Sequence, residues 1–175
     1  MLKSGDLFAT SGGGWLAKGI QAVQWFWSTD NAAPYNHTGV ILSPVGVTLE
    51  ARWRFQKYAL DDYVGYQVLI VRHNSMTKVR FIRGYDAVKP GIGCHYPVWR
   101  FVPFILHLAK FLRFWGKVCS EWTGMFMAGA GFTNIVYGLT PDDLTDRWKI
   151  DKDMVIVFEG VLTVDILKLL KEGVL

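Results

Sequence analysis

The sequence predicts an α+β protein in which an antiparallel sheet packs against helices. Apolar and polar residues alternate through VTLEARW, residues 47–53, as in a strand that buries one face. The tetrapeptide SPVG at 43–46 has proline at the second turn position and joins this strand to HTGVIL at 37–42. Helix-like segments lie before and after this block of strands, an order typical of the α+β class.

The first half of the chain supplies most of the predicted strands. Before the hairpin we expect a strand at 5–10, a glycine-rich loop at 11–14, a helix at 15–27 and a loop at 28–36. The helix is predicted from apolar residues at helical spacing, from Leu16 to Trp27. After the hairpin we expect a strand at 66–72, a helix at 76–87 and a loop with two prolines at 88–100.

The second half supplies mostly helices. A helix is expected to start near Cys119 and end at 129–131, where glycines follow an apolar run. Its small residues, among them Gly124 and Gly129, allow close packing against a sheet. TPDDL at 140–144 starts another helix, with Thr140 as N-cap and Pro141 at the first position. The chain closes with an apolar strand at 154–160 and a helix at 163–173.

Composition restricts the protein class. The 175 residues favour a single domain, 1–175, and 51% hydrophobic residues exclude disorder. The net charge of +4 is spread without long basic runs, so no nucleic-acid partner is expected. Two cysteines form no disulfide framework, and no Cys/His group has zinc spacing, so no metal or other cofactor is expected. The N-terminus has no apolar signal-like segment, which favours a cytoplasmic location.

The aromatic segment 98–115 is too often interrupted for a membrane span. Arg100, Pro103, His107, Lys110 and Arg113 lie within it, whereas a spanning helix needs about 20 mostly apolar residues. Its polar residues recur every three or four positions, which predicts a basic amphipathic helix. Such a helix either packs on the protein core or contacts a membrane surface through residues 98–117.

Cys119 has two interpretations. A cysteine in the first turn of a helix is favoured as a thiolate by the free N–H groups and the helix dipole, and so is a candidate nucleophile. A lone cysteine is also a common buried apolar residue.

A nucleophilic cysteine needs a base, and His37 at the start of a strand is the candidate. If Pro44 and Val45 form the hairpin turn, His37 lies opposite Arg52 with Glu50 diagonally adjacent; a turn one residue earlier places His37 directly opposite Glu50. Both registers keep His37 and Glu50 on one face, so that the carboxylate can orient the imidazole. The other interpretation is a solvated cluster of polar side chains.

Six short segments together resemble the circularly permuted branch of the NlpC-type papain-like cysteine hydrolases, the YiiX-like proteins. In chain order they are GDLF, NHTGVIL, TLEA, GYD, VCSEW and TPDDL, between residues 5 and 144. In this branch the strands with the GD and His motifs precede the cysteine helix, as they do here. The resemblance therefore implies a circularly permuted papain-like fold.

The resemblance also implies a role for each matched residue. Cys119 matches the nucleophile, His37 the general base and Glu50 the residue that orients it. Tyr85 matches a tyrosine that lines the site beside the cysteine, and Ser120 follows the nucleophile and contributes through its backbone. Asp6 of GDLF matches a structural motif residue.

The implied function is that of a cysteine peptidase or amidase, with bacterial or phage cell-wall peptides as the commonest substrates. The aromatic and basic insert at about 95–117 departs from the family pattern and allows two alternatives. One is a lipid-directed hydrolase or acyltransferase of the lecithin retinol acyltransferase type, with an acyl-containing substrate. The other is a non-catalytic membrane or assembly module on the same fold.

Overall fold

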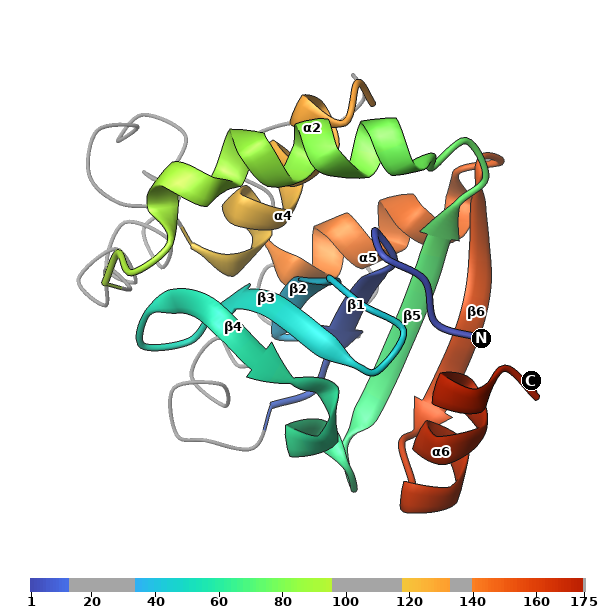
Figure 1. Cartoon of the computed structure of the whole chain (residues 1–175). Coiled ribbons are helices and arrows are strands. Elements are labelled where there is room, and N and C mark those ends of the chain that lie inside the picture. Colours follow the sequence, from blue (N-terminus) through green and yellow to red (C-terminus); the bar gives the residue numbers. More distant parts are fainter. Residues whose placement is uncertain (13–33, 96–117, 133–139, 175) are drawn as a thin grey trace.

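The computed structural model describes residues 1–12, 34–95, 118–132 and 140–174 (Figure 1). In these ranges six strands form one open antiparallel sheet, in the order β4-β3-β2-β1-β5-β6. Their bounds are β1 Leu7–Thr10, β2 His37–Ile41, β3 Val47–Ala51, β4 Phe55–Ala59, β5 Gln67–His73 and β6 Met154–Val161.

Helices accompany the sheet along the described chain. They are η1 Leu60–Tyr63, α2 Lys78–Val88, η2 Lys89–Gly91, α4 Cys119–Gly129, α5 Pro141–Ile150 and α6 Val164–Glu172. The prediction of an α+β protein with an antiparallel sheet packed against helices is therefore confirmed.

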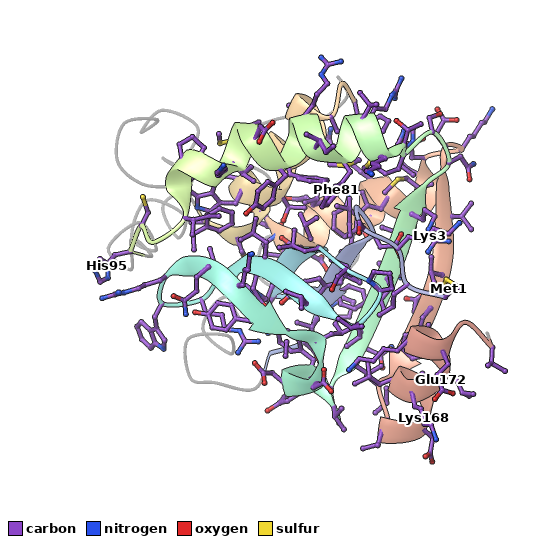
Figure 2. The ribbon with its side chains drawn as sticks, in the orientation of Figure 1. Met1, Lys3, Phe81, His95, Lys168 and Glu172 are labelled. Carbon is purple, nitrogen blue, oxygen red and sulfur yellow. The ribbon has the colours of Figure 1, made fainter. Side chains whose placement is uncertain are left out.

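The sheet buries both faces because its central strands alternate between two apolar clusters. Leu7 and Ala9 of β1 pack with α2, α4 and α5 on one face, whereas Phe8 packs with η1 and α6 on the other. Figure 1 shows α2 and α4 lying together over one part of the sheet and α6 beside the N-terminus. Phe81 points from α2 toward the apolar cluster that contains Leu7 and Ala9 (Figure 2).

Glycines set the close approach of α2 and α4. A Cβ on Gly84 would lie 2.7 Å from the carbonyl oxygen of Phe126, and one on Gly129 would lie 2.4 Å from Cβ of Ala87. The small residues of α4 were expected to face a sheet; Gly129 instead faces α2, because α2 covers the side of α4 that the sheet does not.

The hairpin and the later elements agree with the predictions made from the sequence. Ser43 and Gly46 close the turn, the helix starts at Cys119, and Thr140 caps α5 with its hydroxyl on the N–H of Asp143 at 3.1 Å. Gly173 ends α6 with φ 81°. The strand expected at 47–53 ends at Ala51, and β4 was not predicted, because FQKYA lacks a clean apolar alternation.

Other predictions lie outside the described residues. These are the helix at 15–27, the loop residues up to 33, the amphipathic helix at 98–117 and all of the insert beyond His95. Among the described helices, none has the length and apolar character that a membrane crossing requires.

Candidate active site

His37 is the first residue of β2, and hydrogen bonds of the preceding residue, Asn36, fix the start of this strand. Asn36 is buried, and its side-chain oxygen accepts the N–H of Gly12 at 2.7 Å. The backbone N–H of Asn36 donates to the carbonyl of Thr10 at 3.1 Å. These bonds join the chain after β1 to the start of β2, the strand end that carries the imidazole.

The hairpin register brings Glu50 to His37. Glu50 pairs with Gly39 across β2 and β3, which is the register with Pro44 and Val45 in the turn. Glu50 therefore lies diagonally from His37 on the same face, and its Oε2 is 2.6 Å from Nε2 of the ring. This is the first of the two predicted registers.

Gly39 leaves the space in which this contact forms. A Cβ at this position would lie 2.6 Å from the ring of Phe8 and 2.9 Å from Cβ of Glu50. Any larger residue would push the carboxylate or the ring away. The glycine of the H-x-G segment thus has a steric explanation.

Glu50 is buried, with 1% of its surface exposed, and is held by several donors. The hydroxyl of Thr48 donates to Oε1 at 2.7 Å, and Nε of Arg52 donates to Oε2 at 3.1 Å. The hydroxyl of Tyr63, from η1, also donates to Oε2. The interpretation as a solvated polar cluster is wrong, because η1 and its tyrosine cover this face of the sheet.

Cys119 is the first residue of α4 and is 3% exposed. The Glu121 side chain accepts the N–H of Val118 at 3.1 Å, and this hydrogen bond stabilises the start of α4. One turn later Thr123 bonds back to the carbonyl of Cys119 at 3.0 Å, and its hydroxyl lies 3.2 Å from that of Thr38 on β2. The contact between α4 and β2 thus places the thiol beside the start of β2, next to His37, whose charge and hydrogen bonding lower the pKa of the thiol.

The imidazole therefore lies between a thiol and a carboxylate. Because Nε2 contacts Glu50, Nδ1 is the ring nitrogen that remains for Cys119. Burial lowers the pKa of His37, but its bonds to Cys119 and Glu50 outweigh burial and raise that pKa from 6.5 to about 9.

The pKa values of both partners of His37 shift downward. Burial raises the pKa of Glu50, but the bond and charge of His37 and the charge of Arg52 outweigh it and lower that pKa to about 2. Burial also raises the pKa of the Cys119 thiol, while His37 and the N–H groups of Thr38 and Ser120 lower it, and the net direction is downward. The arrangement favours a thiolate beside an imidazolium, which is the form that attacks carbonyl carbons.

The two accessory residues are placed differently. Ser120 is buried, and its backbone N–H hydrogen bonds to Cys119 and lowers the pKa of the thiol, while its part in a reaction stays a prediction. Tyr85 packs beside Phe81 on α2, where the neighbouring Gly84 contacts Phe126. Tyr85 also packs against the apolar cluster that includes Cys119 and Phe126, and its predicted place beside the thiol stays a prediction.

Asp6 has the structural role that was expected for it. It is buried and accepts Nε of Arg72 at 2.7 Å and the N–H of Lys3 at 2.8 Å. These bonds join the N-terminus to β5. Asp6 therefore stabilises the central strands and takes no part in the Cys119 site.

Sequence reasoning missed Tyr63 and Thr48 as partners of Glu50. Thr48 lies two residues before Glu50, so strand alternation places it on the same face. Tyr63 follows a strand that was not predicted, and nothing near it in the sequence indicates its partner. Only the folded chain brings it to Glu50.

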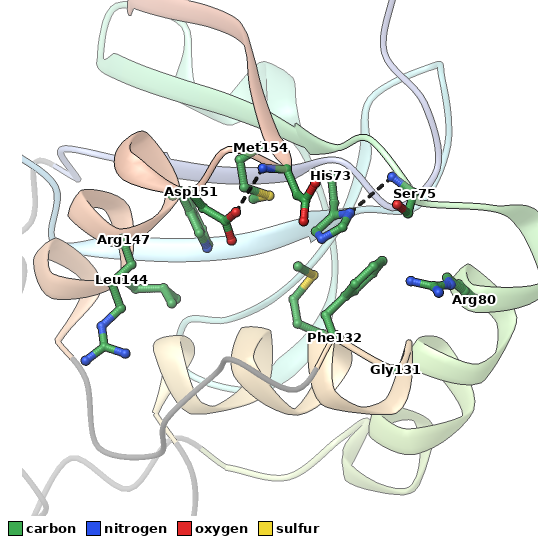
Figure 3. Close-up of a pocket in the computed structure, with 12 residues that line it drawn as sticks. His73, Ser75, Arg80, Gly131, Phe132, Leu144, Arg147, Asp151 and Met154 are labelled. Atoms are coloured by element: carbon green, nitrogen blue, oxygen red, sulfur yellow. Dashed lines mark hydrogen bonds between the residues drawn. The ribbon is translucent and has the colours of Figure 1, made fainter.

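A second polar site lies at the other end of α4 (Figure 3). A cavity of about 240 Å³ is lined there by residues that include His73, Arg80, Phe132, Arg147 and Asp151. His73 stacks on Phe132 with ring centres 3.7 Å apart, and its Nδ1 accepts the N–H of Ser75 at 3.1 Å. None of the three predicted catalytic residues lines this cavity.

The fold and site define a class: an α+β protein with an open six-stranded antiparallel sheet and a Cys–His–Glu cluster where α4 meets β2, in which Cys119 and Glu50 are buried. No family model matches the chain, and no curated protein matches it. A solved structure that the chain resembles is the metalloprotein yiiX from Escherichia coli O157:H7, DUF1105. The match covers 91% of this chain and 98% of that chain, with a TM-score of 0.54 and 13% identity. This similarity shows a YiiX-like fold.

The name of that neighbour raises the question of a metal, and the described residues do not fit one. Among them, no three His, Cys, Asp or Glu side chains are arranged to hold an ion.

Proposed function

We propose that this protein is a cysteine hydrolase that cleaves an amide bond through an acyl-enzyme, with Cys119 as nucleophile, His37 as base and Glu50 as the residue that orients His37. The observation that carries the proposal is the imidazole held between the thiol and a buried carboxylate, with Nε2 2.6 Å from Oε2. Acyl transfer by a cysteine requires a nucleophile in contact with a base, and a base that is oriented by an acid.

Acylation begins with the thiol proton on Nδ1 of His37 and the charge on Sγ of Cys119. The sulfur attacks the carbonyl carbon, and the carbonyl oxygen becomes an oxyanion. The first N–H groups of α4, including that of Cys119, have no acceptor within the helix and face this charge. The imidazolium then gives its proton to the leaving nitrogen, the C–N bond breaks, and a thioester remains.

Deacylation uses the same base on water. Neutral His37 takes a proton from water while the oxygen attacks the thioester carbonyl. The C–S bond then breaks and releases a carboxylic acid, and the sulfur recovers its imidazolium partner. Glu50 remains ionised throughout, because its pKa lies far below neutral pH.

The circularly permuted papain-like assignment belongs to this proposal. It is supported by the order of the motifs, by the α+β fold with its YiiX-like neighbour, and by the meeting of Cys119, His37 and Glu50. A peptide amide is the proposed substrate class, and contact with a membrane surface through residues 98–117 remains a prediction.

The test is a pH titration of thiolate absorbance, which needs no access to the buried sulfur. A Cys94→Ser background removes the exposed second thiol. Cys119→Ser in that background supplies the baseline, and His37→Ala removes the base. We expect the Cys119 thiolate to form below about pH 7, and to form only at higher pH without His37. A thiolate that forms near about pH 8.5 with or without His37 would contradict the proposal.

Hydrolysis then identifies the bond that is cleaved. Peptidyl amides of a fluorescent amine and acyl esters of the matching fluorescent phenol are compared as substrates of wild type and Cys119→Ser. Turnover of amides that Cys119→Ser loses supports the amidase. Turnover of long-chain esters alone favours the lipid-directed alternative, and no turnover despite an ionised thiol favours the non-catalytic module.

A further inference from the structure

One oxygen of Glu50 is shared among three donors. Oε2 contacts Nε2 of His37 at 2.6 Å, Nε of Arg52 at 3.1 Å and the hydroxyl of Tyr63. The other oxygen accepts from Thr48 at 2.7 Å and from Nη2 of Arg52 at 3.3 Å. His37 therefore does not hold this carboxylate alone.

Arg52 is itself fixed on the far side of the carboxylate. Its Nη1 donates to Asp62 of η1 at 2.8 Å. Its guanidinium lies over the rings of Tyr58 and Tyr63, at 4.2 Å and 4.8 Å from their centres. A charged side chain that is paired and stacked in this way keeps its place beside Glu50.

Tyr63 is fixed as a donor. It is 7% exposed, and its ring lies against Phe8, with the centres 5.5 Å apart. Burial and the charge of Glu50 raise the pKa of its hydroxyl, so the proton stays on Tyr63 at neutral pH. Its bond to Oε2 is therefore present whenever Glu50 is ionised.

We infer that Arg52 and Tyr63 are positioning residues that limit how strongly Glu50 holds the protonated form of His37. The inference rests on the proposed function. Ionised groups alternate in sign from η1 to α4: Asp62, Arg52, Glu50, His37 and Cys119. Outside this row, Asp61 of η1 is paired with Lys171 of α6 at 2.8 Å.

The consequence concerns the second half of the reaction. Deacylation needs neutral His37 to take a proton from water, whereas an unshared Glu50 would keep His37 protonated. By engaging Oε2, Arg52 and Tyr63 weaken its attraction for the imidazolium. They thereby lower the pH at which His37 becomes a base.

The experiment follows His37 directly by its ring-proton NMR signal over a pH series, assigned with His37→Ala. Tyr63→Phe removes one hydroxyl, and Tyr58→Phe is its control, because Tyr58 contacts the same Arg52 but its hydroxyl bonds to the carbonyl of Arg54. Arg52→Met removes the cation, and Lys171→Met is its control, because it removes a cation paired with Asp61.

We expect the pKa of His37 to rise by about 0.5 to 1 in Tyr63→Phe and in Arg52→Met, and to stay unchanged in both controls. Single-turnover kinetics should show slower deacylation at neutral pH in the same two variants. An unchanged or lower His37 pKa in folded Tyr63→Phe would overturn the inference, even if activity fell.

The outcomes separate this inference from the proposed function. If wild-type His37 titrates near about 6.5 and is insensitive to Cys119→Ser, the proposed pair is absent and the proposed function fails. If the wild-type pair is intact and the variants titrate as wild type, only the role of Arg52 and Tyr63 fails. Should Arg52→Met not fold, Tyr63→Phe, which changes a single atom, decides the question.

Discussion

A histidine lies at each end of α4, and their surroundings differ. His37, beside Cys119 at the helix start, has a carboxylate oxygen 2.6 Å from its ring nitrogen. His73, against Phe132 just after the helix end, has an aromatic ring 3.7 Å from its own and a backbone N–H on Nδ1. Their pKa values move in opposite directions: that of His37 rises to about 9 and that of His73 falls.

The two pKa shifts differ because the partners of the two histidines differ in kind and in distance. Both rings lose water, which lowers the pKa of each histidine. At His37 the direct contacts with Glu50 and Cys119 exceed that effect, whereas at His73 the aspartates 151 and 153 act only at longer range and do not. A cavity lies at His73, and neither His37 nor Cys119 is among the residues that line it.

The largest expected difference between the two ends is in activity. His37→Ala should reduce hydrolysis by about 10³-fold or more, because it removes the proposed base of both steps. His73→Ala should leave the rate near that of wild type and lower the free energy of unfolding by about 1–3 kcal/mol, through loss of its packing on Phe132. Steady-state kinetics and urea unfolding of both variants check this. A large activity loss in folded His73→Ala would break the comparison.

Glu50→Gln tests whether the carboxylate charge distinguishes the two ends. Because the pKa of Glu50 is lowered from 4.5 to about 2, its ionised form stabilises the fold fully above pH 4.5, and this contribution is lost as the pH falls toward 2. The pH-dependent part is on the order of 3 kcal/mol. Wild type and Glu50→Gln should therefore converge in unfolding free energy between pH 4.5 and 2. Parallel curves would show that Glu50 does not carry this charge effect.

Gly39→Ala tests the space that lets Glu50 reach His37. The added Cβ would meet Phe8 and Glu50, which should cost about 1–3 kcal/mol and lower the pKa of His37 by displacing the carboxylate. Gly84→Ala, with a similar clash against Phe126 seven residues along α4 from Cys119, is the control. Urea unfolding and the His37 NMR titration separate the two. If Gly84→Ala shifts His37 equally, the effect is not local.

The smallest effect concerns the contact between β2 and α4. Thr38→Val removes a buried hydroxyl contact with Thr123 and should cost about 1 kcal/mol. Thr10→Val removes a buried hydroxyl that has no partner among the described atoms, so it should be neutral or stabilising. Thermal unfolding compares the pair. Equal losses would mean that the Thr38–Thr123 contact does not help to position Cys119.

Local chemistry explains which parts of the fold were predictable. The turn at Ser43–Gly46, the start of α4 at Cys119 and the cap at Thr140 each depend on a few neighbouring residues. β4 was missed because an edge strand with Gln56 and Lys57 does not show the pattern of a half-buried strand. The alternation through β3 placed His37 and Glu50 on one face, but it left the register and the burial of that face open.

The sequence by itself determined the α+β class, the hairpin and the candidates Cys119, His37 and Glu50, because periodicity, turns and helix starts are short-range properties. The tertiary structure decided which carboxylate oxygen meets which ring nitrogen, that Tyr63 and Arg52 share that oxygen, and that Glu50 is buried. It also placed Cys119 at His37, a residue 82 positions earlier in the numbering. Such contacts depend on packing between elements that are distant in the chain, and no local pattern records them.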